Sequence, residues 1–341
     1  MSSVAWLSKK LDDGRIMCEA CNQHCKLNDG EYGICGVRKV ENGELQLLTY
    51  GIAAAVNVDP VEKKPMFHFL PDSKVLSFGT VGCNFSCKFC QNADISQYPQ
   101  EHHHEIIGRS LSPQAVVELA LEYKCKSIAY TYNEPAIFFE YAYDTAKLAH
   151  EAGLKNIYVT NGYETHKAID TIAPYLDAMN IDIKGFSKEF YEDICGGALK
   201  PVLDTIEYAR KKGIWIETTT LLIPGYNDSD EEIRAIATFQ ATLDSSMPWH
   251  ISAFHPMYKM LDVPKTPAKT LRRAYEIGKK AGLKYVYVGN IDDGLRESTY
   301  CPNCNKIVIE RHGNIGQYIT NHLLEMDSCP FCATKIDGVW S

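Results

Sequence analysis

The sequence predicts an α/β protein, built as a full or partial barrel of alternating strands and helices with a small cysteine-rich module at each end. The chain has 341 residues and 45% hydrophobic content, which suits one large domain with smaller attachments. Between residues 75 and 290, short apolar runs alternate with helical segments. Of the 13 cysteines, four lie near the N-terminus, three in the centre and four near the C-terminus. We therefore expect domains at 1–74, 75–295 and 296–341.

The central region contains seven strand-like runs, at 75–78, 127–130, 157–159, 178–181, 214–219, 249–253 and 285–288. Helix-start signals lie between them: Ser112 and Thr266 each precede a proline, and Ser229 with Glu232 is typical of a capping box. Strands that alternate with helices imply a parallel sheet covered by helices. An open doubly wound sheet is the competing fold. A barrel would place its chemistry at the C-terminal ends of its strands.

The two terminal regions look too small to build a core unaided. The first 74 residues carry four cysteines and strand-like runs at 45–50 and 52–58, and the last 45 enclose four more cysteines. Modules of this size commonly need a metal or a disulfide. In a reducing compartment, short cysteine spacings favour metal sites.

The charge balance argues against a nucleic-acid-binding protein. The chain has 35 basic and 43 acidic residues, a formal net charge of −8, and so lacks a general basic footprint. No apolar run reaches the roughly 18 residues of a spanning helix, and the first residues lack the order of a signal peptide. We expect a soluble cytoplasmic protein without a membrane segment.

The central cysteines lie in the segment GTVGCNFSCKFCQN, residues 79–92, directly after the first strand of the array. Cys83, Cys87 and Cys90 can each bind one iron of a cubane cluster, which usually takes four cysteines. Three local ligands leave one iron open for a substrate or cofactor, unless a distant cysteine closes it. A structural zinc loop with a fourth ligand is the alternative.

This CxxxCxxC pattern, with an aromatic residue before the last cysteine, resembles the signature of the radical S-adenosylmethionine (SAM) superfamily. The resemblance implies a partial (β/α)6-type barrel and a [4Fe–4S] cluster whose open iron is chelated by SAM. It further implies reductive cleavage of SAM to a 5′-deoxyadenosyl radical, which removes hydrogen from a substrate. A one-electron donor of the flavodoxin or ferredoxin type would supply the electron.

Residues after the next two strands fit the same resemblance. Tyr132, Asn133 and Glu134 belong to YTYNEP, which resembles the GGEP-type segment that contacts the SAM amino group. A charge-assisted hydrogen bond from an ammonium to Glu134 would fix orientation, although a glutamate in a first helical turn would look the same. Thr160 and Asn161, in a TNG turn, are candidates for contacting the ribose or the methionine carboxylate.

Later strand ends supply further candidates. Asp182 and Lys184 resemble the DxK element of glycyl-radical activating enzymes, in which the lysine reaches the SAM carboxylate as a point charge. Thr218 lies in ETTTLLIPGYN, which resembles the segment that packs on the adenine. His255 is a candidate on the substrate side or the SAM side. A solvated Asp–Lys pair and a structural histidine are the alternatives.

The terminal cysteines predict two further metal sites. Cys301, Cys304, Cys329 and Cys332 form two CxxC knuckles typical of structural zinc, with rubredoxin-like iron or an auxiliary Fe–S cluster as alternatives. The other set suits zinc or an auxiliary [4Fe–4S] cluster, and it consists of Cys18, Cys21, Cys25 and Cys35. Zinc is slightly preferred, because a compact segment needs a metal to stabilise it.

Over nearly its whole length the chain resembles the AmmeMemoRadiSam-system radical SAM family, described as pyruvate formate-lyase activating enzyme-like. The terminal cysteines and the segment DPVEKKPMFHFLP, residues 59–71, carry this resemblance. It implies AMMECR1-like and MEMO-like proteins as partners. Because the extra cysteines flank the core, the substrate stays open between a protein, as for a glycyl-radical activase, and a small molecule or lipid. A zinc-ribbon protein that binds nucleic acid or protein without catalysis is the alternative from another class.

Overall fold

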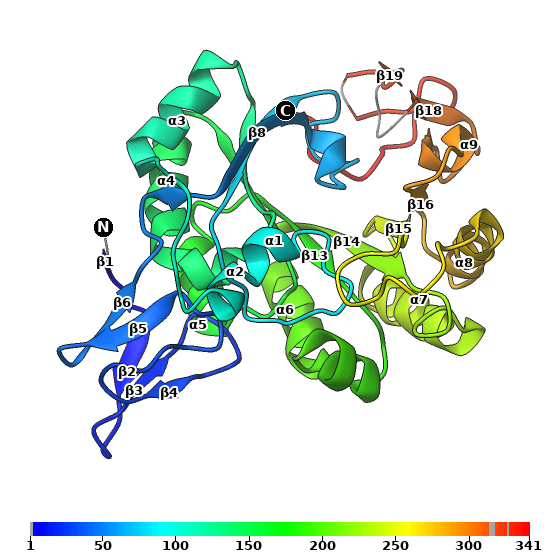
Figure 1. Ribbon diagram of the computed structural model, residues 1–341. Helices are drawn as coiled ribbons and strands as arrows, with labels where there is room; N and C mark the ends of the chain where they lie inside the picture. The colour runs from blue at the N-terminus through cyan, green and yellow to red at the C-terminus, as the bar shows by residue number, and fades with distance from the viewer. Residues whose placement is uncertain (1–2, 314–317, 326) are drawn as a thin grey trace.

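A computed structural model describes residues 3–313, 318–325 and 327–341. Its centre is an eight-stranded sheet in the order β16-β15-β14-β13-β12-β11-β9-β8 (Figure 1). Seven of these strands are parallel, and β8 pairs with β9 antiparallel. The strands are β8 (Ala55–Pro60), β9 (Lys74–Gly79), β11 (Ser127–Tyr130), β12 (Lys155–Thr160), β13 (Ala178–Asp182), β14 (Trp215–Leu222), β15 (Trp249–Ala253) and β16 (Val286–Gly289).

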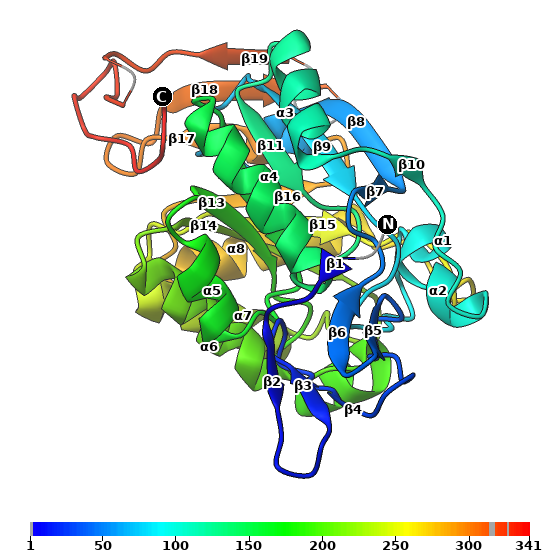
Figure 2. The same cartoon turned by 90° about the vertical axis from the view of Figure 1, so that its left-hand side faces the viewer.

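One long helix follows each of the first six parallel strands and returns the chain to the next. Figures 1 and 2 show these helices along the outside of the curved sheet. They are α3 (Pro113–Glu122), α4 (Phe139–Glu151), α5 (His166–Ile172), α6 (Leu199–Lys211), α7 (Asp230–Asp244) and α8 (Ala268–Lys280). The sequential strand order confirms a partial (β/α)6 barrel, because a doubly wound sheet would reverse its order in the middle.

The predicted helix starts are confirmed in part. The hydroxyl of Ser112 caps α3 and that of Ser229 caps α7. The predicted capping box is wrong, because the Glu232 side chain accepts no hydrogen bond from the Ser229 backbone. It accepts one from the backbone of Ser187 at 3.0 Å instead. The cap at Thr266 is also wrong. Its hydroxyl accepts a hydrogen bond from the backbone N–H of Phe254 and donates to the carbonyl of Leu222, and α8 begins without a side-chain cap.

The N-terminal region forms small antiparallel sheets, β2-β3-β4 and β1-β6-β5, with β7 paired to β10 (Arg109–Ser110). Figure 1 shows them in blue at one edge of the barrel. The strands are β1 (Ser3–Val4), β2 (Ser8–Lys10), β3 (Ile16–Cys18), β4 (Lys26–Leu27), β5 (Arg38–Glu41), β6 (Glu44–Leu47) and β7 (Ile52–Ala53). Since β8 joins the large sheet, the expected boundary at residue 74 separates β8 from the strand with which it pairs.

The C-terminal region consists of α9 (Gly294–Glu297) and a three-stranded antiparallel sheet of β17 (Thr299–Tyr300), β18 (Ile307–His312) and β19 (Tyr318–Asn321). Its apolar side chains pack with Phe67 and Tyr287 of the barrel. Arg311, only 1% exposed, donates a hydrogen bond to the Phe67 carbonyl at 2.7 Å. The described helices include none that is long and apolar enough to cross a membrane.

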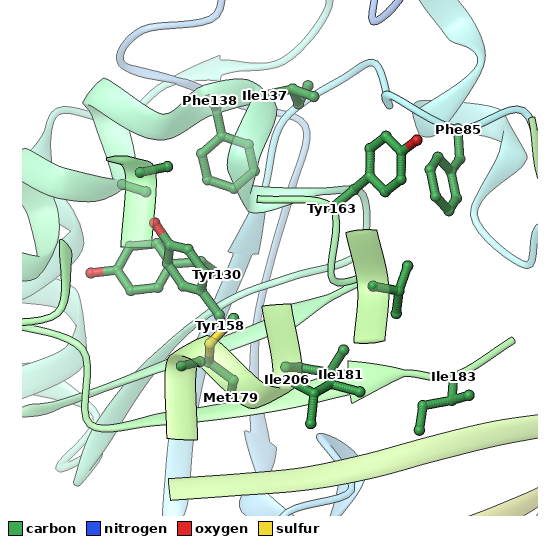
Figure 3. Close-up of a cluster of buried hydrophobic side chains, with 14 of the residues drawn as sticks. Phe85, Tyr130, Ile137, Phe138, Tyr158, Tyr163, Met179, Ile181, Ile183 and Ile206 are labelled. Atoms are coloured by element: carbon green, nitrogen blue, oxygen red, sulfur yellow. The ribbon is translucent and has the colours of Figure 1, made fainter. Parts of the chain in front are cut away.

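Short helical turns complete the fold: η1 (Val61–Lys63), α1 (Ala93–Ser96), α2 (Tyr98–Glu101), η2 (Pro135–Phe138) and η3 (Phe190–Cys195). The core lies between the sheet and the helices (Figure 3). There Tyr130 and Tyr158 meet edge to face with their ring centres 5.4 Å apart. Phe85, from the central cysteine loop, packs against Tyr163 in the same way at 4.9 Å. This contact anchors the loop to the core.

Candidate active site and metal centres

A cavity of about 420 Å³ lies at the carboxyl ends of the parallel strands, and Cys83, Cys87 and Cys90 all line it. The loop that carries them begins at Gly79, the last residue of β9. A Cβ on Gly79 would lie 2.2 Å from the carbonyl oxygen of Thr131, so the close approach of these two strand ends requires glycine. The sequence thus brings the three cysteines to the place where a barrel keeps its chemistry.

The three cysteines are spaced in a way that fits a cubane cluster. Within the described part of the chain, only the four C-terminal cysteines form a group of three or more potential ligand atoms that all lie within 4.8 Å of one another. Cys83, Cys87 and Cys90 share a cavity without forming such a compact group, as expected if each thiolate bound a different iron. Cys195 lies close to Cys87 but does not line the cavity, so three thiols face it.

Lys184 and Asp182 also line this cavity and form an ion pair, with Nζ 2.6 Å from Oδ2. Burial would lower the pKa of Lys184, but the charges of Asp182 and Cys87 raise it well above its ordinary value. The hydrogen bond with Cys195 and the nearby Lys184 lower the pKa of Cys87, against the effect of burial. A partly buried cation therefore stands near a thiol whose pKa it helps to lower.

Thr160 and Asn161 line the cavity at the end of β12, whereas Glu134 is fully buried behind them and does not line it. Glu134 accepts hydrogen bonds from the Asn161 backbone at 2.8 Å and from the Thr160 hydroxyl at 2.9 Å. Burial, followed by the charge of Glu164, raises the pKa of Glu134 well above its ordinary value. In this geometry Glu134 positions the cavity wall.

Tyr132 and Asn133 both line the cavity, but their polar groups already have partners. The Asn133 side chain donates to the Thr80 hydroxyl and to the Gly82 carbonyl, each at 3.0 Å, and so supports the cysteine loop. The Tyr132 hydroxyl donates to Asp59 at 3.2 Å. Both residues therefore brace the site.

Besides Glu134, two predicted residues are not brought to the cavity. Thr218 is fully buried, and its hydroxyl donates to Gln240 of α7 on the outer face of β14. Its neighbour Thr219 lines the cavity instead, because successive side chains of a strand face opposite sides. His255 is exposed on the loop after β15 and does not line the cavity.

Sequence reasoning missed several polar residues of the cavity wall: Lys64, Asn92, Thr219, Ser252 and Asn290. Asn290 directly follows β16, so the expectation that site residues follow the barrel strands could have identified it. Ser252 and Thr219 lie inside strands, where the inward-facing set depends on a register of one residue.

The C-terminal cysteines form a compact group. Cys301 and Cys332 have their sulfurs 3.6 Å apart, and Cys304 and Cys329 have theirs 3.7 Å apart. Four thiolates at about 2.3 Å from one tetrahedral zinc ion would stand roughly 3.8 Å apart. This set therefore has the geometry of a site for a single metal ion.

Comparisons with known proteins relate this chain to one superfamily. Residues 78–237 match the radical SAM superfamily. An uncharacterized protein of Methanocaldococcus jannaschii is 43% identical over 98% of this chain and 99% of its own length. A protein of the same organism named “Putative glycyl-radical enzyme activating enzyme” is 29% identical over 63% of this chain and 79% of its own. In fold, the chain is similar to a radical SAM methyltransferase from Sphaerobacter thermophilus, with a TM-score of 0.52 and 17% identity over 70% of this chain and 71% of that one.

The chain contains a radical SAM domain and is a radical SAM enzyme. Members of this superfamily use a [4Fe–4S] cluster and SAM, and the homologues of this chain include activating enzymes at low identity.

Proposed function

We propose that this protein holds a [4Fe–4S] cluster on Cys83, Cys87 and Cys90 and cleaves SAM reductively in the cavity at the strand ends. The observation that carries this proposal is the meeting of three cysteine thiols and one partly buried lysine, Lys184, in a single cavity. When bound, the cluster and SAM supply a 5′-deoxyadenosyl radical, which abstracts hydrogen from a substrate.

The residues of the chain divide the work of binding SAM. Lys184 is the cation for the methionine carboxylate, and Asp182 holds its ammonium group in place at 2.6 Å. Thr160 and Asn161 contact the ligand from the end of β12, with Glu134 fixing them from behind. Asp182 also faces the cavity and is the proposed substrate-side group.

The activating-enzyme relative supports a protein as the hydrogen donor and a small redox protein of the flavodoxin or ferredoxin class as the electron source. AMMECR1-like and MEMO-like proteins are our candidate partners, on the resemblance of the whole chain. Transfer of the radical to a candidate partner would leave a new electron paramagnetic resonance (EPR) signal on that partner, whereas a small-molecule substrate would leave none.

The test is the EPR spectrum of the anaerobically reduced protein before and after SAM is added. We expect SAM to change the spectrum of wild type and of Cys125→Ala, a matched variant at a buried cysteine outside the site. The SAM-induced change should disappear in Cys90→Ala. A wild-type spectrum that SAM leaves unchanged, or a Cys90→Ala spectrum that still responds, would contradict the proposal.

A further inference from the structure

The four N-terminal cysteines, Cys18, Cys21, Cys25 and Cys35, line one small cavity inside the N-terminal module. Gly33 lies on its wall. A Cβ built on Gly33 would lie 3.7 Å from the sulfurs of both Cys25 and Cys35, an ordinary van der Waals contact, so this residue borders both thiols.

The spacing of these four sulfurs differs from that of the C-terminal set. The C-terminal sulfurs all lie within 4.8 Å of one another, while no three of the N-terminal ones form such a group among the described residues. Thiolates of a cubane bind four separate irons and stand further apart than thiolates of one ion. The two sets within one structure thus favour a single ion at the C-terminus and a cluster at the N-terminus.

Asn84 also lines the N-terminal cavity. Its side-chain amide indicates that a hydrogen-bond acceptor belongs inside this cavity. Its Oδ1 accepts a hydrogen bond from Asn161 at 2.7 Å, which fixes the orientation of the amide. Its Nδ2 is buried and makes no hydrogen bond of normal length, although the amide lies next to the Cys21 thiol. Buried donors are normally satisfied, and the sulfur atoms of a bound cluster would accept this one.

Arg38, which is ion-paired with Glu140 at 2.6 Å, supplies N–H donors on another wall of the cavity. It is 2% exposed, and its Nη1 lies 3.9 Å from the sulfur of Cys18. Its Nε donates to the Ile137 carbonyl at 2.8 Å, which holds the guanidinium against the barrel. A fixed N–H donor beside Cys18 suits a metal-bound thiolate, which accepts hydrogen bonds.

The N-terminal cavity lies next to the central cysteine loop. Cys83 lines the cavity at the strand ends, and the next residue, Asn84, lines the N-terminal cavity. A Cβ on Gly82 would lie 2.5 Å from the carbonyl oxygen of Cys35, so the two loops are in direct backbone contact. Two centres at these sites would be neighbours in the fold.

We propose that Cys18, Cys21, Cys25 and Cys35 hold a second [4Fe–4S] cluster that passes electrons to the cluster on the central loop. Four protein ligands leave no iron open for substrate, so electron transfer is the chemistry available to it. One electron leaves a donor of the ferredoxin or flavodoxin class, reduces the second cluster, and then moves to the first. This relay rests on the proposed function, whereas the presence of the second cluster does not.

The test removes the central cluster and asks what iron remains. The triple variant Cys83→Ala, Cys87→Ala, Cys90→Ala leaves the N-terminal module untouched and cannot cleave SAM by the proposed route. After anaerobic reconstitution, we expect it to keep about half of the wild-type iron and acid-labile sulfide, about four of each per chain. Dithionite should reduce this remaining cluster and give an EPR signal that SAM does not change.

Two further variants assign the remaining cluster. Adding Cys25→Ala, at a half-buried cysteine, to the triple variant should remove the iron and sulfide, whereas adding Cys125→Ala should not. A triple variant that holds no acid-labile sulfide would overturn the proposal, and so would a cluster that survives Cys25→Ala. A remaining cluster that dithionite cannot reduce would overturn the relay. None of these readouts depends on SAM cleavage.

Discussion

Glu134 and Glu164 lie on either side of the Thr160 hydroxyl, whose oxygen is 2.9 Å from one carboxylate and 2.6 Å from the other. Thr160 has one hydroxyl hydrogen and can donate it to one carboxylate only. The second short contact therefore requires a protonated carboxyl. Burial raises the pKa of both groups, in agreement with a pair that shares a proton behind the cavity at the strand ends.

This pair predicts a pH-dependent stability. A carboxyl whose pKa is raised by folding favours the folded state at low pH, and that contribution is lost as the pH rises above about 4.3 and through the raised folded value. Urea unfolding should therefore show a smaller free energy of unfolding for wild type at pH 8 than at pH 5. Glu164→Gln should reduce this difference, while Glu122→Gln, at an exposed position of α3, should leave it intact. If Glu164→Gln kept the full difference in unfolding free energy between pH 5 and pH 8, this result would contradict the shared proton.

Lys184 predicts a specific loss of SAM affinity. Replacing it with methionine removes a charge-assisted hydrogen bond, and we expect SAM to bind about ten- to a hundredfold more weakly. Iron and sulfide content should stay at the wild-type level. The matched control is Lys200→Met, which removes an exposed lysine paired with Asp204 on α6. Equilibrium dialysis with labelled SAM measures both, and equal affinity in the two variants would remove Lys184 from the site.

Arg38 predicts a large effect on stability, because it forms a buried ion pair with Glu140 at 2.6 Å. Breaking such a pair leaves an uncompensated charge and costs about 3–5 kcal/mol. Arg38→Met should lower the free energy of unfolding by this order, whereas Arg210→Met, which breaks the exposed pair with Asp244, should cost less than about 1 kcal/mol. Similar costs in the two variants would show that Glu140 finds another partner.

The C-terminal site predicts one bound ion without sulfide. Because its sulfurs stand 3.6 and 3.7 Å apart, we propose zinc there. Cys304→Ala should lose one zinc per chain in elemental analysis and keep the acid-labile sulfide of wild type. It should also make the module from residue 296 onward easier to cleave by protease, since the metal stabilises a small core. Loss of sulfide in this variant would contradict the assignment.

Much of the fold follows from the sequence because local signals agree with the global pattern. The seven parallel strands lie where apolar runs predicted them, and Ser112 and Ser229 cap their helices. The position of β8 could not be predicted in this way. Its pairing with β9 is antiparallel and the connection between them includes η1, so nothing in its own residues distinguishes it from the strands of the N-terminal module.

The site shows the same division. Cysteine spacing and strand ends indicated the loop and the Asp182–Lys184 pair, which the structure places in one cavity. The choice between Thr218 and Thr219 depends on which face of β14 looks inward, and two adjacent threonines carry no signal for this. The place of Glu134 behind the wall, and the wider spacing of the N-terminal sulfurs, arise from tertiary packing alone.

The central claim is tested most directly by measuring 5′-deoxyadenosine formed from SAM by the anaerobically reduced protein. The account predicts that wild type and Cys125→Ala form 5′-deoxyadenosine and methionine in equal amounts. Cys87→Ala should form neither above the background of free reductant. A Cys87→Ala protein that cleaves SAM at the wild-type rate, or a fully reconstituted wild type that forms no 5′-deoxyadenosine, would contradict it.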